Sequence, residues 1–592
     1  MPRRHRGGLD QPAELLGTVL DVAALVAKPF AGDHQLPGRG DPTAKLPQQP
    51  AADILRQAWR ARRMKVHNGL AAGAVDMLAA RPPRPHEPPR QLTGRDDDPA
   101  PRRTNCRDTG HTVKIAGEAC LNTNANTNGR SSMHAIHHPT PSGRGAGSAG
   151  RFSLAAAALA VVVSAAAVGA DEPVSLWSRE GEDWPALLGP RGDGRSRLSG
   201  AAIPWPEAGP PVVWTTDLGE GYCGPVAALG RLLVYDRIDD ACRLRCLHAE
   251  TGRELWRSSD PTDYADQFGY DGGPRASPLV AHLRVLTYGP DGLLSCRRLA
   301  DGARLWQRDT VADYHVVPNF FGVGASPVVV EAAGRTLVVV QVGGSPPESR
   351  PVAPDRLDTV RGLDSGLVAF DLESGREVWR ASAELASYAA PLVAAPLGRP
   401  RLLAWMRERL VAVEPESGLV TGEFRWRAEK LFSVNAASPV LVGERLLLSE
   451  CYGPGSVLLE IRADGPRGER FEPVWQSPRR ARPTSTLLAH WATPLVVDGH
   501  LYGTSGRNAG DARLVCLAAE SGQPAWHHRG LGRASMTFLD GHLLVVGEFG
   551  ELELVAARPD RYEAVSRATL VDGDGRPLLE PPCWAAPVVA HG

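Results

Sequence analysis

Four aspartates are the residues of this 592-residue chain best suited to hold a metal: Asp236, Asp239, Asp240 and Asp271. Carboxylate oxygens are the ligands that a hard cation such as Ca²⁺ prefers. All four lie in stretches whose residue types predict β-hairpin turns, where an aspartate is ordinarily solvated. We therefore expect neither a metal ligand nor a catalytic residue among them.

The histidines and cysteines add little chemistry. His527 and His528 follow a predicted sheet edge, and we interpret them as a solvated pair. No Cys-x-x-Cys motif occurs, which argues against a zinc ribbon or a covalent haem site. The seven cysteines after residue 170 are an odd number, which argues against a full disulfide framework. These patterns predict no metal site.

Aromatic loops are the best candidates for a binding surface. Tyrosines begin and end residues 264–270, and His315 and residues 319–321 precede a later predicted sheet. His490, Trp491 and residues 500–506 flank the opening strand of another sheet, where a ligand role is a further hypothesis. Because several of these segments precede strands at similar places in a repeat, we expect the aromatic loops on one face.

A repeated motif separates these candidates: a short apolar run, an acidic or small turn, then Gly-x-x-x-Trp, clearest at residues 367–379. Glycine permits the positive φ of a tight hairpin, and the indole can pack between neighbouring sheets. The predicted structural residues are Gly252, Trp256, Gly302, Trp306, Gly375, Trp379, Gly422, Trp426, Gly522 and Trp526. A small residue lies six positions before the turn glycine: Cys246, Cys296, Ala369, Cys516 and, counted from Gly418, Ala412.

The spacing of this motif predicts the architecture. Its tryptophans lie 50, 73, 47 and 100 residues apart, and Trp475 divides the last interval into 49 and 51. A period near 50 with strand-like runs is typical of a β-propeller. We expect seven blades near residues 222–259, 271–309, 321–382, 388–429, 434–478, 490–530 and 534–572. Four of them open with Ala-Ser-Pro or Ala-Thr-Pro, at residues 276–278, 325–327, 437–439 and 492–494.

The two ends of the propeller region predict one more blade. Residues 210–219 look like the last strand of a blade, and residues 583–592 like an opening strand. Pairing them would close the ring and remove an exposed edge. We therefore predict an all-β fold: an eight-bladed, alternatively seven-bladed, β-propeller with an incomplete last blade closed by the termini.

Composition divides the chain before this region. Residues 1–150 are rich in Pro, Arg, Gly, Asn and His and are predicted to be disordered. Residues 151–170 combine a basic flank, an apolar stretch and small residues, which predicts a signal peptide, or else a membrane anchor. Since a signal peptide lies near a start codon, we expect the protein to begin at Met133. Residues 171–209 form a lead-in, and the net charge of −1 gives no reason to expect nucleic acid.

The motif at residues 369–379, Ala-x-Asp-x-x-Ser-Gly-x-x-x-Trp, resembles the tryptophan-docking repeat of pyrroloquinoline quinone (PQQ) dehydrogenases. It equally resembles that of PQQ-like propellers without the cofactor, and the resemblance covers about residues 210–592. Residues 184–194 resemble the segment preceding many exported PQQ-like repeat proteins. That group is similar to the propeller lipoprotein of outer-membrane barrel assembly, a scaffold. This chain departs from that lipoprotein because no cysteine closely follows its apolar segment.

The resemblance implies two functions. The first is an exported, non-catalytic binding or scaffold protein of the periplasm or cell envelope, with a protein or envelope polymer as partner and no cofactor. Its membrane contact would come only through residues 151–170, if these are not cleaved. The alternative is an alcohol or sugar dehydrogenase that uses PQQ with calcium. Alcohol-oxidising relatives typically carry two adjacent cysteines over the cofactor, and this chain has no Cys-Cys pair. We therefore expect the first function.

Overall fold

The computed structural model describes residues 175–591 apart from 203, 267, 269, 350–353, 431–432 and 479. The predicted N-terminal extension (1–150), its expected start at Met133 and the predicted signal segment (151–170) lie outside the described residues. The described chain forms seven antiparallel sheets of four strands, each in sequence order. The all-β prediction is confirmed.

The sheets are named 1 to 7 in chain order, and their boundaries follow the predicted blades. Sheet 1 comprises β1 (Val226–Ala228), β2 (Arg231–Ile238), β3 (Ala241–His248) and β4 (Glu254–Pro261). Sheet 2 comprises β5 (Leu279–Ala281), β6 (Arg284–Tyr288), β7 (Leu293–Arg298) and β8 (Arg304–Asp309). Sheet 3 comprises β9 (Val328–Ala332), β10 (Arg335–Gln341), β11 (Leu367–Asp371) and β12 (Glu377–Ala381). Sheet 4 comprises β13 (Leu392–Ala394), β14 (Arg401–Trp405), β15 (Arg409–Val413) and β16 (Val420–Arg425).

The remaining sheets have the same plan. Sheet 5 comprises β17 (Val440–Val442), β18 (Arg445–Ser449), β19 (Ser456–Gly465) and β20 (Gly468–Gln476). Sheet 6 comprises β21 (Leu495–Val497), β22 (His500–Ser505), β23 (Arg513–Ala518) and β24 (Pro524–His528). Sheet 7 comprises β25 (Ser535–Leu539), β26 (His542–Val546), β27 (Glu551–Ala556) and β28 (Ala564–Thr569). The short helices are α2 (Thr310–Tyr314), η2 (Pro347–Ser349), η3 (Pro354–Thr359) and η4 (Pro396–Gly398).

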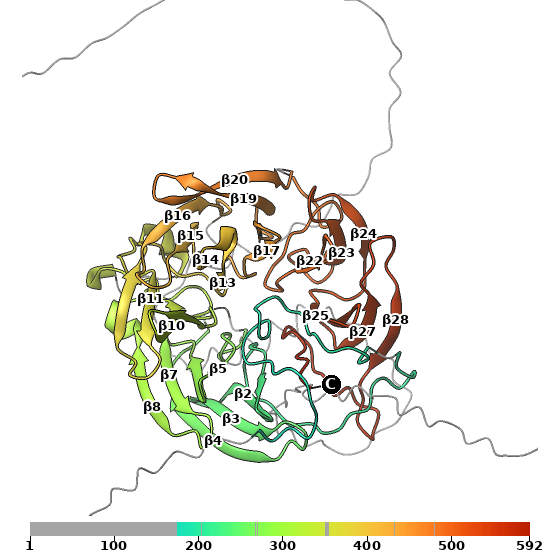
Figure 1. The fold of residues 1–592 in the computed structure, drawn as a ribbon. Coiled ribbons are helices and arrows are strands. Elements are labelled where there is room, and N and C mark those ends of the chain that lie inside the picture. Colours follow the sequence, from blue (N-terminus) through green and yellow to red (C-terminus); the bar gives the residue numbers. More distant parts are fainter. Residues whose placement is uncertain are drawn as a thin grey trace, which may run out of the picture. The chain divides into compact units, whose positions relative to one another are not determined.

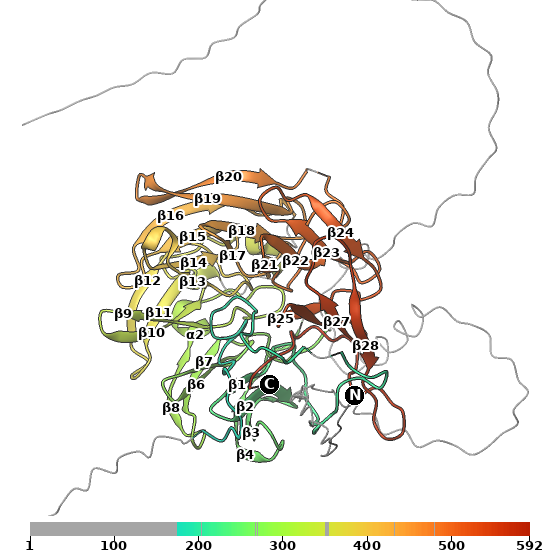
Figure 2. The same cartoon turned by 45° about the vertical axis from the view of Figure 1, so that its right-hand side comes forward.

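The sheets follow one another around a common centre (Figures 1 and 2). Labelled first strands such as β13 and β17 lie toward this centre, and labelled fourth strands such as β20 and β28 lie at the outside. Apolar clusters fill the spaces between neighbouring sheets, for example between β6 of sheet 2 and β10 of sheet 3. Middle strands are therefore largely buried, and several contain continuous apolar runs, as in β14, where every residue is buried.

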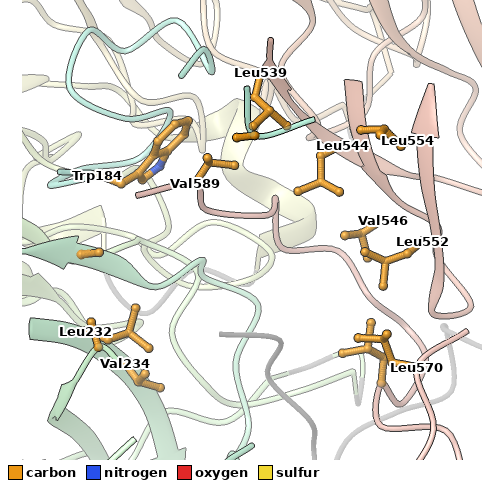
Figure 3. Packing of buried hydrophobic residues seen from close by; sticks show 14 of the residues in the cluster. Trp184, Leu232, Val234, Leu539, Leu544, Val546, Leu552, Leu554, Leu570 and Val589 are labelled. Carbon is orange, nitrogen blue, oxygen red and sulfur yellow. The ribbon is translucent and has the colours of Figure 1, made fainter. Parts of the chain in front are cut away.

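The lead-in and the C-terminal segment occupy the space between sheet 7 and sheet 1. Within the described chain neither residues 210–219 nor residues 583–591 form a strand, so the predicted eighth sheet is absent there. The lead-in instead bonds to both neighbouring sheets: Trp184 N donates to Ala227 O (2.8 Å), and Ser196 N donates to Phe538 O (2.8 Å). Figure 3 shows Trp184 and Val589 between the side chains of the two sheets.

The repeated tryptophans connect each sheet to the next. Trp306 of sheet 2 donates its Nε1 proton to Leu372 O of sheet 3 (2.8 Å), and its ring lies against the turn glycine Gly375. In the same way, four other tryptophan rings lie against the turn glycine of the following sheet: Trp214 against Gly252, Trp256 against Gly302, Trp379 against Gly418 and Trp475 against Gly522. Trp526 reaches the glycine-free turn of sheet 7, where its Nε1 donates to Arg558 O (2.9 Å). Each of these glycines thus leaves room for the indole that precedes it around the ring.

The fourth copy differs from the predicted pair of Gly422 and Trp426. The turn glycine there is Gly418, while Gly422 lies in β16 opposite Ala412. In sheets 1, 2, 3 and 6 that position holds the tryptophan, opposite a fully buried Cys or Ala. A Cβ at Gly422 would lie 2.7 Å from Glu469 O, because β20 of sheet 5 passes close to β16. Trp426 follows β16 and donates its Nε1 proton to Gly455 O (3.1 Å).

Candidate functional site

A cavity of about 350 Å³ is lined mainly by the segments that precede the first strands of the sheets, together with residues 584–588. Residues of the lead-in and of β25 also line it, as do Tyr452 and Arg507 from loops between second and third strands. Because every sheet begins near the centre of the ring, these loops meet there although they come from all parts of the chain. We call this space the axial cavity. Its volume falls within the range of small-molecule sites.

Hydroxyl groups from the repeated sheet openings contribute to its wall. Ser277, Ser326, Ser438 and Thr493 each come from an Ala-Ser-Pro or Ala-Thr-Pro opening and line the cavity. The amide of Ser277 donates to Ser326 Oγ (2.9 Å), and the amide of Ser438 donates to Thr493 Oγ1 (3.0 Å). We call these four residues the hydroxyl belt. The motif that marks the start of a blade therefore also supplies polar groups to the cavity.

An arc of aromatic rings forms one side of the cavity. Successive ring centroids are 4.6 Å apart from Tyr222 to Trp584, 4.6 Å from Trp584 to Trp491 and 4.3 Å from Trp491 to His490. The ring planes of these three pairs are tilted by 42°, 50° and 41°. Tyr452 completes the arc, and its hydroxyl is 2.8 Å from His490 Nε2. Together the five side chains present several ring faces at different angles.

The predicted aromatic loops meet at the rim of the cavity, where Arg275 lies between the rings of Phe321 and Tyr222. Phe268 and Tyr270, from the loop before sheet 2, lie 5.7 Å and 5.8 Å from Phe321, in the loop before sheet 3. Phe321 in turn contacts Tyr388 of the next loop. Phe268 is 49% and Tyr270 62% exposed; Tyr270 lines the cavity, and Phe268 lies beside it against Phe321. These two residues are available to an incoming molecule.

Arginine is the only formally charged residue type among the described residues that line the cavity, at positions 275, 507 and 533. Arg275 Nη2 pairs with Asp266 (2.8 Å), and Arg533 Nε donates to Glu548 (2.9 Å). The Arg533 guanidinium also lies 4.9 Å and 4.8 Å from the ring centroids of Trp491 and Trp584. Arg507 lies 4.8 Å from the Tyr452 ring and has no ion pair within the described chain. The wall therefore has a positive character.

Two cavity-side groups have shifted pKa values. Burial, together with the charges of Arg533 and Arg507, lowers the pKa of His490 to about 3, so its imidazole is neutral near pH 7. Burial alone would raise the pKa of Glu548, but the hydrogen bonds and charge of Arg533 outweigh it and hold that pKa below its ordinary value. The Glu548 carboxylate also accepts the indole proton of Trp584 (3.2 Å). It thereby anchors both Arg533 and the C-terminal segment.

Several predicted residues lie away from the cavity. His315 caps the C-terminus of α2 and is exposed, and His500 is the first residue of β22. His527 lies on the outer strand β24, where His528 stacks on Tyr562 at 3.6 Å.

Two of the four aspartates differ from the expected solvated state. Asp236 is buried in β2 and accepts both hydrogen bonds of Arg243, and buried Asp271 accepts the amide protons of Gly221 and Gly273. Asp239 and Asp240, in the hairpin after β2, are exposed as predicted. In the described part of the chain no group of three His, Cys, Asp or Glu residues is arranged to hold a metal.

The wall of the cavity does not fit PQQ with a calcium ion. No carboxylate of the described residues lines it to supply a hard cation with oxygen ligands. The contacting ring pairs of the aromatic arc are 4.3–5.5 Å apart and tilted. A planar quinone inserted between two rings requires them about 7 Å apart and parallel, since carbon atoms pack at about 3.5 Å.

Comparison with known proteins agrees with the PQQ-like propeller repeat seen in the fold. A family model described as PQQ_2, outer membrane protein assembly factor BamB, matches residues 206–345 and 324–565. The chain belongs to this family. A search of curated proteins found no match.

Solved structures that the search matched include an assembly factor, BamB, and two dehydrogenases. BamB from Moraxella catarrhalis is 14% identical with a TM-score of 0.35, over 56% of this chain and 79% of that one. Quinohemoprotein alcohol dehydrogenase ADHIIG from Pseudomonas putida HK5 is 14% identical with a TM-score of 0.35, over 57% and 62%. This chain thus spans less than two thirds of that dehydrogenase. A europium-containing methanol dehydrogenase is 10% identical with a TM-score of 0.36, over 67% and 88%. At these scores the likenesses carry no argument about function.

Proposed function

We propose that this protein is a non-catalytic binding protein of the cell envelope that holds a protein or envelope polymer at its axial cavity. The observation behind the proposal is the cavity wall itself, which combines aromatic rings, arginines and the hydroxyl belt. Such groups bind and orient a ligand. His490 is the wall's candidate general base, but a base is most effective with a pKa near the working pH, and that of His490 is about 3.

The envelope location is part of the same proposal. It is supported by the apolar segment at residues 151–170, which predicts export, and by the family description, which names an outer membrane assembly factor. In the described part of the chain no helix is both long and apolar enough to cross a bilayer. The alternative function, a PQQ-dependent alcohol or sugar dehydrogenase, is disfavoured by the poor fit of the cavity wall.

Two measurements on the full chain test the proposal. Addition of PQQ and calcium should produce no reduction of an electron-accepting dye. Immobilised cell-envelope polymers, fractionated into protein and carbohydrate, should retain the wild-type chain. The double variant Phe268→Ser, Tyr270→Ser should be retained several-fold less, because both exposed rings of the rim are lost.

A matched control is Leu305→Ser, since Leu305 is 40% exposed but lies on the outer strand β8. This variant should be retained like the wild type. Dye reduction that depends on PQQ, or equal retention of the rim variant and the control, would overturn the proposed function.

A further inference from the structure

We infer that the axial cavity binds an acidic sugar, with the carboxylate or sulfate group of the sugar at Arg507 and its ring against the aromatic arc. This inference rests on the proposed function and names the ligand class of the same site. It follows from three features of the wall: its charge, the angles between its rings and its hydrogen-bonding groups.

The charge of the wall favours an anion. Three guanidinium groups and no carboxylate line the cavity within the described chain. Asp266 and Glu548 pair with Arg275 and Arg533, so those two arginines are already compensated. Arg507 has no such carboxylate partner in the described chain. Its guanidinium lies over the Tyr452 ring, and therefore beside the aromatic arc. A planar fork of N–H donors is well suited to a carboxylate or sulfate.

The aromatic arc favours a ring that is not flat. Its contacting pairs are tilted by 41° to 78°, so they offer faces in different directions and no parallel slot. A pyranose presents C–H groups on both faces of a puckered ring, and these can pack on aromatic faces at different angles. A flat aromatic acid would use only one of those faces.

The hydrogen-bonding groups favour a sugar over an acidic peptide. The hydroxyl belt can pair with sugar hydroxyls, since each hydroxyl both donates and accepts. A peptide bound as an extra strand needs free backbone groups. Here the amides of Ser277 and Ser438 are bonded to the next sheet, and that of Tyr222 donates to Pro274 O (3.0 Å).

Isothermal titration of the full chain tests the inference with four probes: digalacturonic acid, glucose 6-sulfate, neutral cellobiose and tetraglutamate. The first two separate a carboxylate ligand from a sulfate ligand. At least one of them should bind, with an affinity that falls as salt is added because the contact at Arg507 is exposed. Cellobiose and tetraglutamate should bind at least about ten-fold more weakly, because cellobiose has no anionic group for Arg507 and tetraglutamate has no sugar ring for the aromatic arc.

The Arg507→Gln substitution should lower the affinity for the acidic sugar by about ten- to a hundred-fold, which is the usual effect of losing a charged hydrogen bond. Arg507→Lys should lie in between, because it keeps the charge and loses the fork. Arg253→Gln is the control: Arg253 is exposed, lies between β3 and β4 and does not line the cavity. It should leave binding unchanged.

The contrary results separate failure of this inference from failure of the proposed function. Equal binding of cellobiose, binding of tetraglutamate alone, or an unchanged affinity in Arg507→Gln would overturn the acidic-sugar inference. So would the absence of binding by every probe, even if envelope polymers still retain the chain through its aromatic rim, in which case the proposed function stands. Turnover with PQQ would instead refute the proposed function.

Discussion

Gly375→Ala should destabilise the fold far more than a glycine substitution in an ordinary hairpin. Gly375 has a φ of +63°, and a Cβ there would lie 2.5 Å from Cδ2 of Trp306. Carbon atoms pack at about 3.5–4.0 Å, so the indole would have to move by roughly 1 Å. That movement would stretch the hydrogen bond from Trp306 Nε1 to Leu372 O, now 2.8 Å, and disturb the contact between sheets 2 and 3.

Gly334→Ala in the same sheet provides the matched control. Gly334 has a φ of +74°, and a Cβ there meets nothing within 4 Å. Both substitutions carry a left-handed backbone cost of about 1–2 kcal/mol. Only Gly375→Ala adds a lost hydrogen bond of about 1 kcal/mol and overpacking of about 1–3 kcal/mol. Its free energy of unfolding should therefore be about 2–4 kcal/mol below that of the control.

Urea unfolding followed by circular dichroism measures this difference. The same pair of substitutions in a Trp306→Ala background isolates the indole, because without the ring both should then cost the same. Equal midpoints for Gly375→Ala and Gly334→Ala in the wild-type background would refute the docking of indole on glycine as a determinant of stability.

Two further predictions concern charged groups. Asp260→Asn breaks the buried pair with Arg297 (2.7 Å) between sheets 1 and 2 and should cost about 3–5 kcal/mol, whereas Asp301→Asn, in a half-exposed pair with Arg298, should cost under about 1 kcal/mol. Similar urea midpoints for both variants would contradict this. His490 has a folded pKa of about 3, so the unfolded chain binds the extra proton between pH 3 and about 6.5, and stability falls as the pH drops through that window. Protonation of His490 in the unfolded chain should lower the free energy of unfolding by about 2 kcal/mol between pH 7 and pH 5. If the free energy of unfolding of the wild type falls no more steeply with pH than that of His490→Asn, the effect is excluded.

The blades were predictable because two local signals recur among them. The glycine turn followed by tryptophan marks the outer hairpin, and the Ala-Ser-Pro opening marks the inner strand. The predicted pair of Gly422 and Trp426 was wrong because it fits Gly-x-x-x-Trp by itself. Four residues after the true turn glycine, Gly418, the chain has Gly422 instead of a tryptophan. The strand pairing shows that Gly422 stands opposite Ala412, where other sheets have the tryptophan, and the close contact with β20 explains why no side chain fits there.

The cavity was predictable only in part. The loops at residues 264–270 and 319–321 stood out through their aromatic composition, and the structure brings them together. No local sequence pattern marked Arg507, Arg533 or Trp584. These residues lie in separate segments, and only the arrangement of the sheets in a ring brings them to the same cavity. The hydroxyl belt did have one, because its residues belong to the repeated sheet openings.

A crystal structure of the full chain with bound digalacturonic acid or glucose 6-sulfate tests the central claim most directly. We expect electron density for the ligand in the axial cavity, with its anionic group at the Arg507 guanidinium and its ring against Trp491 or Trp584. Ligand density confined to the outer strands, or an anionic group turned away from Arg507, would contradict the account.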